Sequence, residues 1–300
     1  MRIPFELAET VAAVVDEGTL DAAARRLHIT PSAVSQRIKA LEREVGRVLL
    51  VRSKPARATE AGTVVVRLAR QLALLEHDAR TALGGEDGGE GEDAPQRVTV
   101  PLAVNADSLA TWFLAPLARL AHEHPVTFEL HRDDQEYTTG QLEEGLVMGA
   151  VTSQAVAVAG CSVVPIGTMA YRGVAQPEFA ATWFPHGVTA GALARAPVVD
   201  FNRKDELQTD WLIARGVDPG APPRHHVPSS ADFATAVRLG MGWGMLPPFQ
   251  CDDELAGGRL VDLGGLPIEV RLYWQQWNLH SGLLDTVGAA IVEEGRRALR

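Results

Sequence analysis

Two short helical patterns, separated by a break, lie between positions 18 and 46 and carry the side chains that first suggest a function. The second pattern opens on Thr30, a residue type that caps helices, and on Pro31, which suits the first helical position. Its apolar residues recur at spacings of four, three and four. The short or flexible hydrogen-bonding side chains are left together on the outer face: Ser32, Ser35, Gln36 and Lys39. A helix, a tight turn and a second helix with a polar, acid-free face is the helix-turn-helix pattern, which places its second helix in the major groove of DNA.

The charge of this region favours the same interpretation. Nine Lys and Arg residues and only two acids lie between positions 25 and 57, whereas the whole chain has a formal net charge of −10. Because a basic segment on an acidic protein is the electrostatic footprint of phosphate contact, we predict that this part of the chain binds double-stranded DNA. The alternative is an amphipathic helical hairpin in an all-helical domain.

A short basic turn follows the two helices. Residues 49–51 are apolar, and Arg52 and Arg57 lie on either side of Pro55. We expect a β-ribbon, or wing, whose arginines hold phosphates or the adjacent minor groove. An ordinary charged hairpin is the alternative.

A long helix is predicted from position 59 to about 83. Its apolar residues alternate spacings of four and three in a heptad seam: Ala61, Val65, Leu68, Leu72, Leu75, Ala79 and Ala82. We therefore expect a coiled-coil helix that forms a homodimer or a dimer of dimers. Glycines and acids dominate residues 84–95, which predicts a hinge.

Strand and helix patterns alternate after position 96, which predicts a parallel α/β sheet. One helix is expected from about 106 to 123, and a second α/β unit from about 168. No charge occurs between positions 145 and 171, but two buried strands and a turn explain this stretch better than a membrane span. We expect no membrane association.

Ligands of open α/β sheets bind outside the carboxyl ends of strands, near the start of the next helix. Residues 105–108 (Asn-Ala-Asp-Ser) and 229–232 (Ser-Ser-Ala-Asp) fit that description and could hold a carboxylate, although both are also plain helix-capping sequences. Acids at the predicted strand ends favour a cation: Asp107, Asp133, Asp134, Asp200 and Asp232. A ligand with both a carboxylate and a positive group would be a basic amino acid.

Residues 1–84 resemble the DNA-binding half of LysR-type transcriptional regulators, through AARRLHITPSAVSQRIKALEREVG and the wing LLVRSKPARATEAG. The resemblance covers nearly the whole chain. NADSLATWFLAPL, GLVMGAV, FPHGVT and LYW resemble the lysine- and arginine-sensing branch known as ArgP or LysG. This resemblance implies an α/β multidomain fold with a winged helix-turn-helix, a coiled-coil linker helix and a two-lobed, periplasmic-binding-protein-like effector domain. It also implies L-lysine or L-arginine as effector, control of amino-acid export genes, and contact with RNA polymerase.

The residue patterns and the resemblance together give two sets of candidate site residues. The predicted DNA contacts are Thr30, Pro31, Ser32, Ser35, Gln36, Lys39, Arg52 and Arg57. The predicted effector contacts are Asn105, Asp107, Ser108, Asp133, Asp134, Phe201, Ser229, Ser230, Asp232 and Trp274. The sequence departs from the family pattern at residues 200–202 (Asp-Phe-Asn), because an acid is expected after the phenylalanine.

We predict four segments: a DNA-binding domain over 1–58, a dimerisation helix over 59–84, a hinge over 85–95 and an effector domain over 96–300. Lobe 1 takes about 96–167 and 270–300, and lobe 2 about 168–269. Cys161 and Cys251 are interpreted as reduced thiols, which suits a cytoplasmic protein. An enzyme, or an amino-acid-binding protein without DNA function, would leave residues 1–84 unexplained. We expect no catalysis, no cofactor and no metal, and a different small effector stays open.

Overall fold

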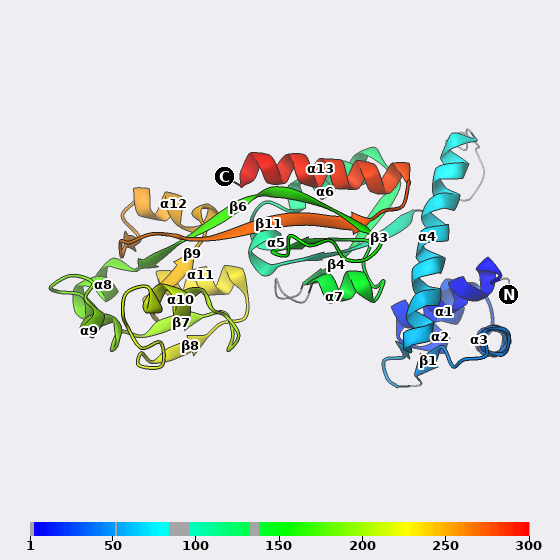
Figure 1. Ribbon diagram of the computed structural model, residues 1–300, viewed down its shortest axis with the longest axis horizontal. Helices are drawn as coiled ribbons and strands as arrows, with labels where there is room; N and C mark the ends of the chain where they lie inside the picture. Colours follow the sequence, from blue (N-terminus) through cyan, green and yellow to red (C-terminus); the bar gives the residue numbers. More distant parts are fainter. Residues whose placement is uncertain (1–2, 52, 84–96, 133–137, 300) are drawn as a thin grey trace. The chain divides into compact units, whose positions relative to one another are not determined.

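The computed structural model of the chain describes residues 3–51, 53–83, 97–132 and 138–299 (Figure 1). The chain divides into two compact units. Unit 1 contains Met1–Val104, Pro116–Val164 and Trp274–Ile291. Unit 2 contains Asn105–Ala115, Pro165–Tyr273 and Val292–Arg300.

Unit 1 begins with a helical part. Its elements are α1 (Phe5–Glu17), α2 (Leu20–Arg26), α3 (Pro31–Val45), the antiparallel strands β1 (Leu50–Val51) and β2 (Arg57–Ala58), and α4 (Glu60–Ala82). One hydrophobic core joins them, and Val11, Val34 and Leu41 are fully buried in it. The turn between α2 and α3 needs His28 at a φ of 54°, a conformation that is uncommon outside glycine.

The predicted start of the second helix is confirmed. The Thr30 hydroxyl accepts a hydrogen bond from the backbone N–H of Ala33 at 3.1 Å, and Pro31 occupies the first helical position. Gly46 ends the helix in the left-handed region, with a φ of 72°.

Helix α4 uses its apolar residues in two ways. Val65 and Ala69 are buried in the core of the helical part, mainly through the packing of α4 on α1. The expectation that Val65 belongs to a seam for a partner helix is therefore wrong, because its own chain already covers it. Leu75 is 40% exposed, and Ala79 and Ala82 are also exposed.

Two polar side chains fasten α4 to the α/β part of unit 1. Arg70 donates to the carbonyl oxygen of Gly145 at 2.7 Å and pairs with Asp16 of α1 at 2.5 Å. Asp78 accepts the backbone N–H groups of Gly282 and Leu283, at the beginning of α13 (Gly282–Ala298). Because helix N-termini present unsatisfied N–H groups, Asp78 acts as a cap supplied by a distant segment.

The α/β part of unit 1 is a mainly parallel sheet, as the alternating patterns predict. Strand β3 (Val98–Val104) lies between β4 (Val126–Arg132) and β5 (Gly149–Thr152) and is parallel to both. Strand β11 (Ile268–Trp277) follows β5 in the sheet order. The helices α6 (Leu114–Glu123) and α7 (Thr138–Glu143) belong to this part.

The single helix predicted over about 106–123 is wrong. The chain forms two helices, α5 (Ala106–Thr111) and α6, with a turn at Trp112 and Phe113. Both aromatic side chains are buried, with their ring centroids 5.6 Å apart, and the backbone N–H of Phe113 bonds back to the carbonyl of Ser108. The turn forms because two adjacent aromatic rings are buried together. The helical periodicity of the sequence does not predict such a turn.

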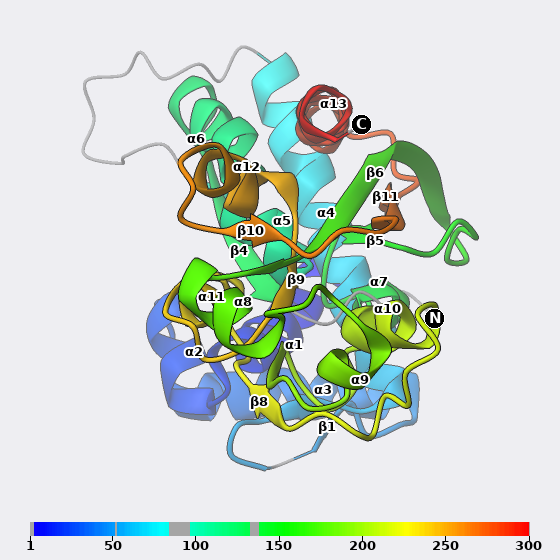
Figure 2. The same ribbon diagram turned by 90° about the vertical axis from the view of Figure 1, so that its left-hand side faces the viewer.

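Unit 2 contains the strands β7 to β10 and most of β6. The long strand β6 (Cys161–Ala175) pairs antiparallel with β9 (Gly244–Leu246) and β10 (Val261–Asp262), and β7 (Val198–Asp200) pairs parallel with β8 (Arg224–His226). The helices are α8 (Pro177–Trp183), α9 (Ala190–Leu193), α10 (Leu207–Ile213), α11 (Ser230–Arg238) and α12 (Pro248–Ala256). Strand β9 lies between α10 and α11 (Figure 2).

The uncharged stretch from 145 to 171 contains two strands, β5 and most of β6, as predicted. Strand β5 is buried, but the part of β6 up to residue 171 is mostly half-buried or exposed, so the prediction that both strands are buried is wrong for β6. Among the described residues, no helix is long and apolar enough to cross a membrane.

Candidate functional site

The outer face of α3 presents the predicted DNA-reading side chains together. Ser32, Gln36 and Lys39 are exposed, and Ser35 is half-buried, while Val34 is fully buried on the opposite side. Thr30 and Pro31, at the start of the helix, are exposed as well. Helix α3 therefore offers a continuous polar surface, which is the geometry a recognition helix needs to approach base edges.

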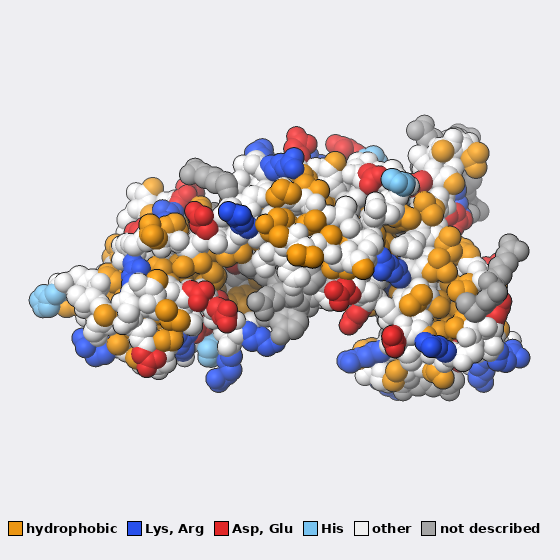
Figure 3. Space-filling model, viewed as in Figure 1, with side chains coloured by type: hydrophobic (Ala, Val, Ile, Leu, Met, Phe, Trp, Pro, Cys, Tyr) orange, Lys and Arg blue, Asp and Glu red, His pale blue; other side chains and the backbone are white. Residues whose placement is uncertain are grey.

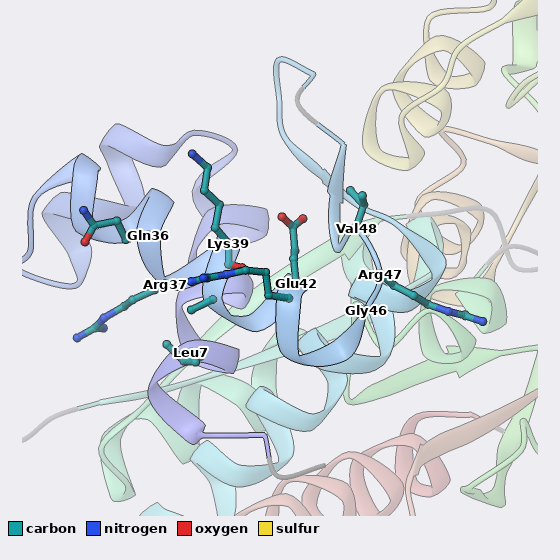
Figure 4. A pocket seen from close by; sticks show the side chains of 10 residues that line it. Leu7, Gln36, Arg37, Lys39, Glu42, Gly46, Arg47 and Val48 are labelled. Atoms are coloured by element: carbon teal, nitrogen blue, oxygen red, sulfur yellow. The ribbon is translucent and has the colours of Figure 1, made fainter.

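An open groove continues this surface toward the end of α3 (Figure 4). Figure 4 shows Gln36 and Lys39 extending outward from the helix and Arg47 extending from the turn after it. Arg43 and Arg47 line the groove, and the candidate list based on sequence missed both. Their signal was present in the count of basic residues, and the helical spacing of four places Arg43 beside Lys39. The position of Arg47, in the turn after the helix, needs the structure.

One acid of this basic region has a structural role. The Glu42 carboxylate accepts the backbone N–H of Leu49 at 2.9 Å, just before β1. This hydrogen bond ties the end of α3 to the wing and directs the charge of Glu42 to the backbone. Lys and Arg side chains gather on the face that carries α3 and β1 (Figure 3).

The wing has the predicted strands. Arg57, in β2, is exposed, and so is Lys54 in the turn. Arg52 lies outside the described residues. The described part of the wing therefore presents positive side chains to solvent, as phosphate contact requires.

The first candidate effector segment is built around Asp107 of α5. The Tyr171 hydroxyl of β6 donates to one Asp107 carboxylate oxygen at 2.7 Å, and the Ser230 hydroxyl of α11 donates to the other at 2.6 Å. Gln250 of α12 donates to the Ser230 oxygen at 2.8 Å and fixes that hydroxyl in turn. Four elements of unit 2 thus hold one half-buried carboxylate in place. Sequence reasoning missed Tyr171 and Gln250, because hydrogen bonds across 64 and 20 residues leave no local pattern.

Asp107 has no cationic partner among the described residues, since the ion pairs of unit 2 join other side chains. Asn105 and Ser108 on either side of it are 2% and 0% exposed, and their side-chain polar atoms have no hydrogen-bond partner. A buried polar group without a partner costs about 1–3 kcal/mol. This segment therefore has unused donors, unused acceptors and an uncompensated negative charge.

The residues of the second candidate segment, 229–232, have different hydrogen-bonding roles. Ser230 contacts Asp107, whereas the Ser229 hydroxyl accepts the backbone N–H of Asp232 as the N-cap of α11. Asp232 is exposed. Capping accounts for Ser229, the alternative that the sequence left open.

Asp200 was expected to face a bound cation, and this expectation is wrong. Asp200 is 1% exposed and pairs with Arg224 of β8 at 2.6 Å. Burial raises the pKa of Asp200, and the hydrogen bond and charge of Arg224 lower it. A buried carboxylate needs such a partner, so Arg224 already compensates the charge of Asp200.

Trp274 lies in unit 1, where it is buried and its indole N–H donates to Gln276 at 2.7 Å. Its ring lies against Gly149, where a Cβ would come within 2.4 Å of it. Phe201 is half-buried in unit 2 and packs on the core that contains Val199 and Phe233. Asp133 and Asp134 lie outside the described residues.

A winged helix-turn-helix followed by a long helix and an α/β domain with an uncompensated, preorganised carboxylate defines a DNA-binding regulator with an effector-binding domain. Residues 5–63 match the family of bacterial regulatory helix-turn-helix proteins called the lysR family, and residues 95–296 match the LysR substrate binding domain. The chain belongs to the LysR family of transcriptional regulators. It is therefore not an enzyme.

Within this family, the chain is similar to regulators named LysG and ArgP. The regulator LysG of Mycobacterium tuberculosis is 45% identical over 285 residues, which cover 93% of this chain and 91% of that protein. The crystal structure of ArgP from Mycobacterium tuberculosis has a TM-score of 0.83 at 40% identity and covers 100% of this chain and 99% of that chain. Full-length LysG of Corynebacterium glutamicum, solved with bound effector Arg, has a TM-score of 0.75 at 37% identity and covers 99% of this chain and 100% of that chain.

Proposed function

We propose that this protein is a cytoplasmic, homodimeric regulator, able to form a dimer of dimers, whose binding to promoter DNA responds to a basic amino acid, L-lysine or L-arginine. Its target genes would serve the export or metabolism of amino acids, and RNA polymerase would be its further partner. The segment boundaries predicted above, with the winged domain at 1–58 and the effector domain at 96–300, belong to this proposal.

The Asp107 carboxylate is the observation that carries the effector assignment. Tyr171 and Ser230 orient it with neutral hydroxyls, so its charge is left for a ligand. Asn105 and Ser108 supply unused donors beside it, which suit the carboxylate of an amino acid. A ligand with a positive and a negative group bonded to one carbon fits this arrangement, and the arginine bound to a LysG relative supports it.

For DNA, Ser32, Ser35 and Gln36 would read base edges in the major groove, because hydroxyl and amide groups offer both donors and acceptors. Thr30 and Pro31 would set the start of the reading helix close to the groove. Lys39, Arg52 and Arg57 would hold phosphates or the adjacent minor groove, and these contacts would make the affinity depend on salt.

Dimerisation would use the exposed apolar side chains of α4. Val64 is 66% exposed and Leu75 is 40% exposed, and Leu68 and Leu72 between them are half-buried. A second copy of α4 would cover this stripe and would place two reading heads on one DNA site. Arg70 would couple a conformational change of the effector domain to helix α1, since it contacts both Gly145 and Asp16.

The test is a selection of DNA from the fragmented genome of the source organism by the full-length protein, with arginine, lysine, glutamate or no addition. We expect a few fragments to be enriched, and the enrichment to change with arginine or lysine and to stay constant with glutamate. If the enrichment is the same with and without each amino acid, the protein does not respond to a basic amino acid and the effector assignment is refuted. If no fragment is enriched, the assignment of Ser32, Ser35 and Gln36 to base contacts is refuted.

A further inference from the structure

Unit 2 contains a second half-buried carboxylate that has no cationic partner among the described residues. Asp205 lies between β7 and α10, and its two carboxylate oxygens accept the backbone N–H groups of Phe201 at 2.9 Å and Leu207 at 3.1 Å. Like Asp107, it is oriented by neutral donors only, and no described ion pair of unit 2 includes it. The family pattern predicted an acid directly after Phe201. In the structure, the acid at the backbone N–H of Phe201 is Asp205, which lies four residues further along the chain.

Asp205 lies within electrostatic range of the Asp107 site. Burial raises the pKa of Asp205, the N–H groups of Phe201 and Leu207 lower it, and the carboxylates of Asp200 and Asp107 raise it. Arg224 compensates one of these three acids through its pair with Asp200. Two negative charges, those of Asp107 and Asp205, are therefore left uncompensated in one region.

An unused hydrogen-bonding atom also lies near Asp205. Gln208, in the first turn of α10, is 1% exposed, and its amide N–H₂ donates to the carbonyl of Val199 while its oxygen has no partner. A buried acceptor such as the Gln208 oxygen favours a ligand with several N–H donors, because a buried acceptor without a hydrogen bond costs free energy. An ammonium group has three N–H donors and a guanidinium has five.

We propose that Asp205, with Gln208 beside it, binds the side-chain cation of the basic amino-acid effector and selects arginine and lysine over neutral amino acids of the same length. This inference rests on the proposed function. The ammonium and carboxylate groups of an amino acid are bonded to one carbon, so their partners must be neighbours, and Asn105, Asp107 and Ser108 are neighbours. The second positive group of arginine or lysine lies at the other end of the molecule and needs a second carboxylate, which Asp205 supplies.

The test is calorimetric titration of the full-length protein with two matched ligand pairs. Citrulline replaces the guanidinium of arginine with a neutral group of similar shape, and norleucine removes the ammonium of lysine. The variants are Asp205→Asn and Asp205→Ser, which remove the charge but keep one oxygen that can accept one of the two backbone N–H groups. Asp218→Asn is the control, because Asp218 also accepts a backbone N–H, that of Gly220 at 2.9 Å, in an exposed turn of unit 2.

We expect the wild-type protein to prefer arginine over citrulline by about 10- to 100-fold, the value of a charge-assisted hydrogen bond. Each Asp205 variant should lose that preference and keep its affinity for citrulline within about threefold, whereas Asp218→Asn should behave as wild type. An unchanged arginine-to-citrulline ratio in a folded Asp205 variant would overturn the proposal, and so would an equal loss for both ligands. If the wild-type protein binds neither arginine nor lysine, the proposed function itself fails. If the asparagine variant does not fold, the serine variant gives the result.

Discussion

Replacing Asp107 with asparagine removes one negative charge from the candidate effector site while keeping its shape. In the wild-type protein both carboxylate oxygens accept hydroxyl hydrogens, from Tyr171 at 2.7 Å and from Ser230 at 2.6 Å. The asparagine oxygen can keep one of these bonds. Its N–H₂ group can donate to the other hydroxyl, because hydroxyl groups both donate and accept. We therefore expect the free energy of unfolding without ligand to change by less than about 1 kcal/mol.

Arginine binding should respond much more strongly to this change. A hydrogen bond between charged groups contributes about 1.5–3 kcal/mol, so its loss should weaken arginine binding about 10- to 150-fold. Isothermal titration of the full-length protein measures the affinity, and thermal unfolding without ligand checks the fold. Asp253→Asn, which changes an exposed acid on α12, should leave both quantities at wild-type values. An Asp107→Asn variant that unfolds normally and binds arginine within threefold of wild type would refute the assignment of Asp107.

Four further predictions concern DNA binding, stability and pH. The double change Ser35→Ala with Gln36→Ala should lower the ratio of specific to random DNA affinity in a competition assay, and equal losses on both DNAs would contradict base reading by these residues. Arg57→Ala should reduce the slope of log affinity against log salt by about 1 on any DNA, and an unchanged slope would remove Arg57 from the phosphate contacts. Leu41→Ala, at a fully buried core position, should cost about 2–5 kcal/mol in denaturant unfolding, and a cost below about 1 kcal/mol would mean that the core is not as described. Because the pKa of Asp205 is raised in the folded chain, its charge destabilises the fold above that pKa and ceases to do so below it, so wild type should gain stability relative to Asp205→Asn as the pH falls toward 3.8. Urea unfolding at several pH values checks this last point, and a constant difference between the two proteins would contradict it.

The sequence was most informative where the physical signal is local. The cap at Thr30, the proline after it and the glycine at position 46 each act within one turn of a helix, and the structure has the helix between them. The alternation of strands and helices likewise depends on nearby residues, and it predicted the parallel strands β3, β4 and β5.

The errors come from contacts between distant residues. Asp200 is paired with Arg224, which lies 24 residues away, so its sequence context gave no sign that the charge was compensated. Val65 fits a heptad seam equally well whether it faces a partner helix or α1 of its own chain, and the fold chose α1. The turn at Trp112 and Phe113 arises because both rings are buried, which only tertiary packing decides.

Part of the candidate site was predictable, and part was not. Asn105, Asp107 and Ser108 were found because they follow a strand and open a helix, and Ser230 because it opens another. Tyr171 and Gln250 reach the candidate site from segments that do not resemble ligand-binding loops. Asp205, which we propose as a further contact, was missed because the family pattern led us to look for an acid directly after Phe201, whereas the loop folds the carboxylate of Asp205 back onto the N–H of Phe201.

If this LysR-family regulator responds to a basic amino acid, that amino acid must stabilise the folded protein. Thermal unfolding of the full-length protein with lysine, arginine, ornithine, histidine, glutamate, leucine and simple carboxylic acids measures this response. A ligand at a hundred times its dissociation constant should add about 2.7 kcal/mol to the stability of the native state. We expect that lysine or arginine raises the unfolding temperature and that glutamate and leucine do not. If only anionic or apolar ligands raise it, the uncompensated carboxylate of Asp107 is not the effector contact, and this account of the site is wrong.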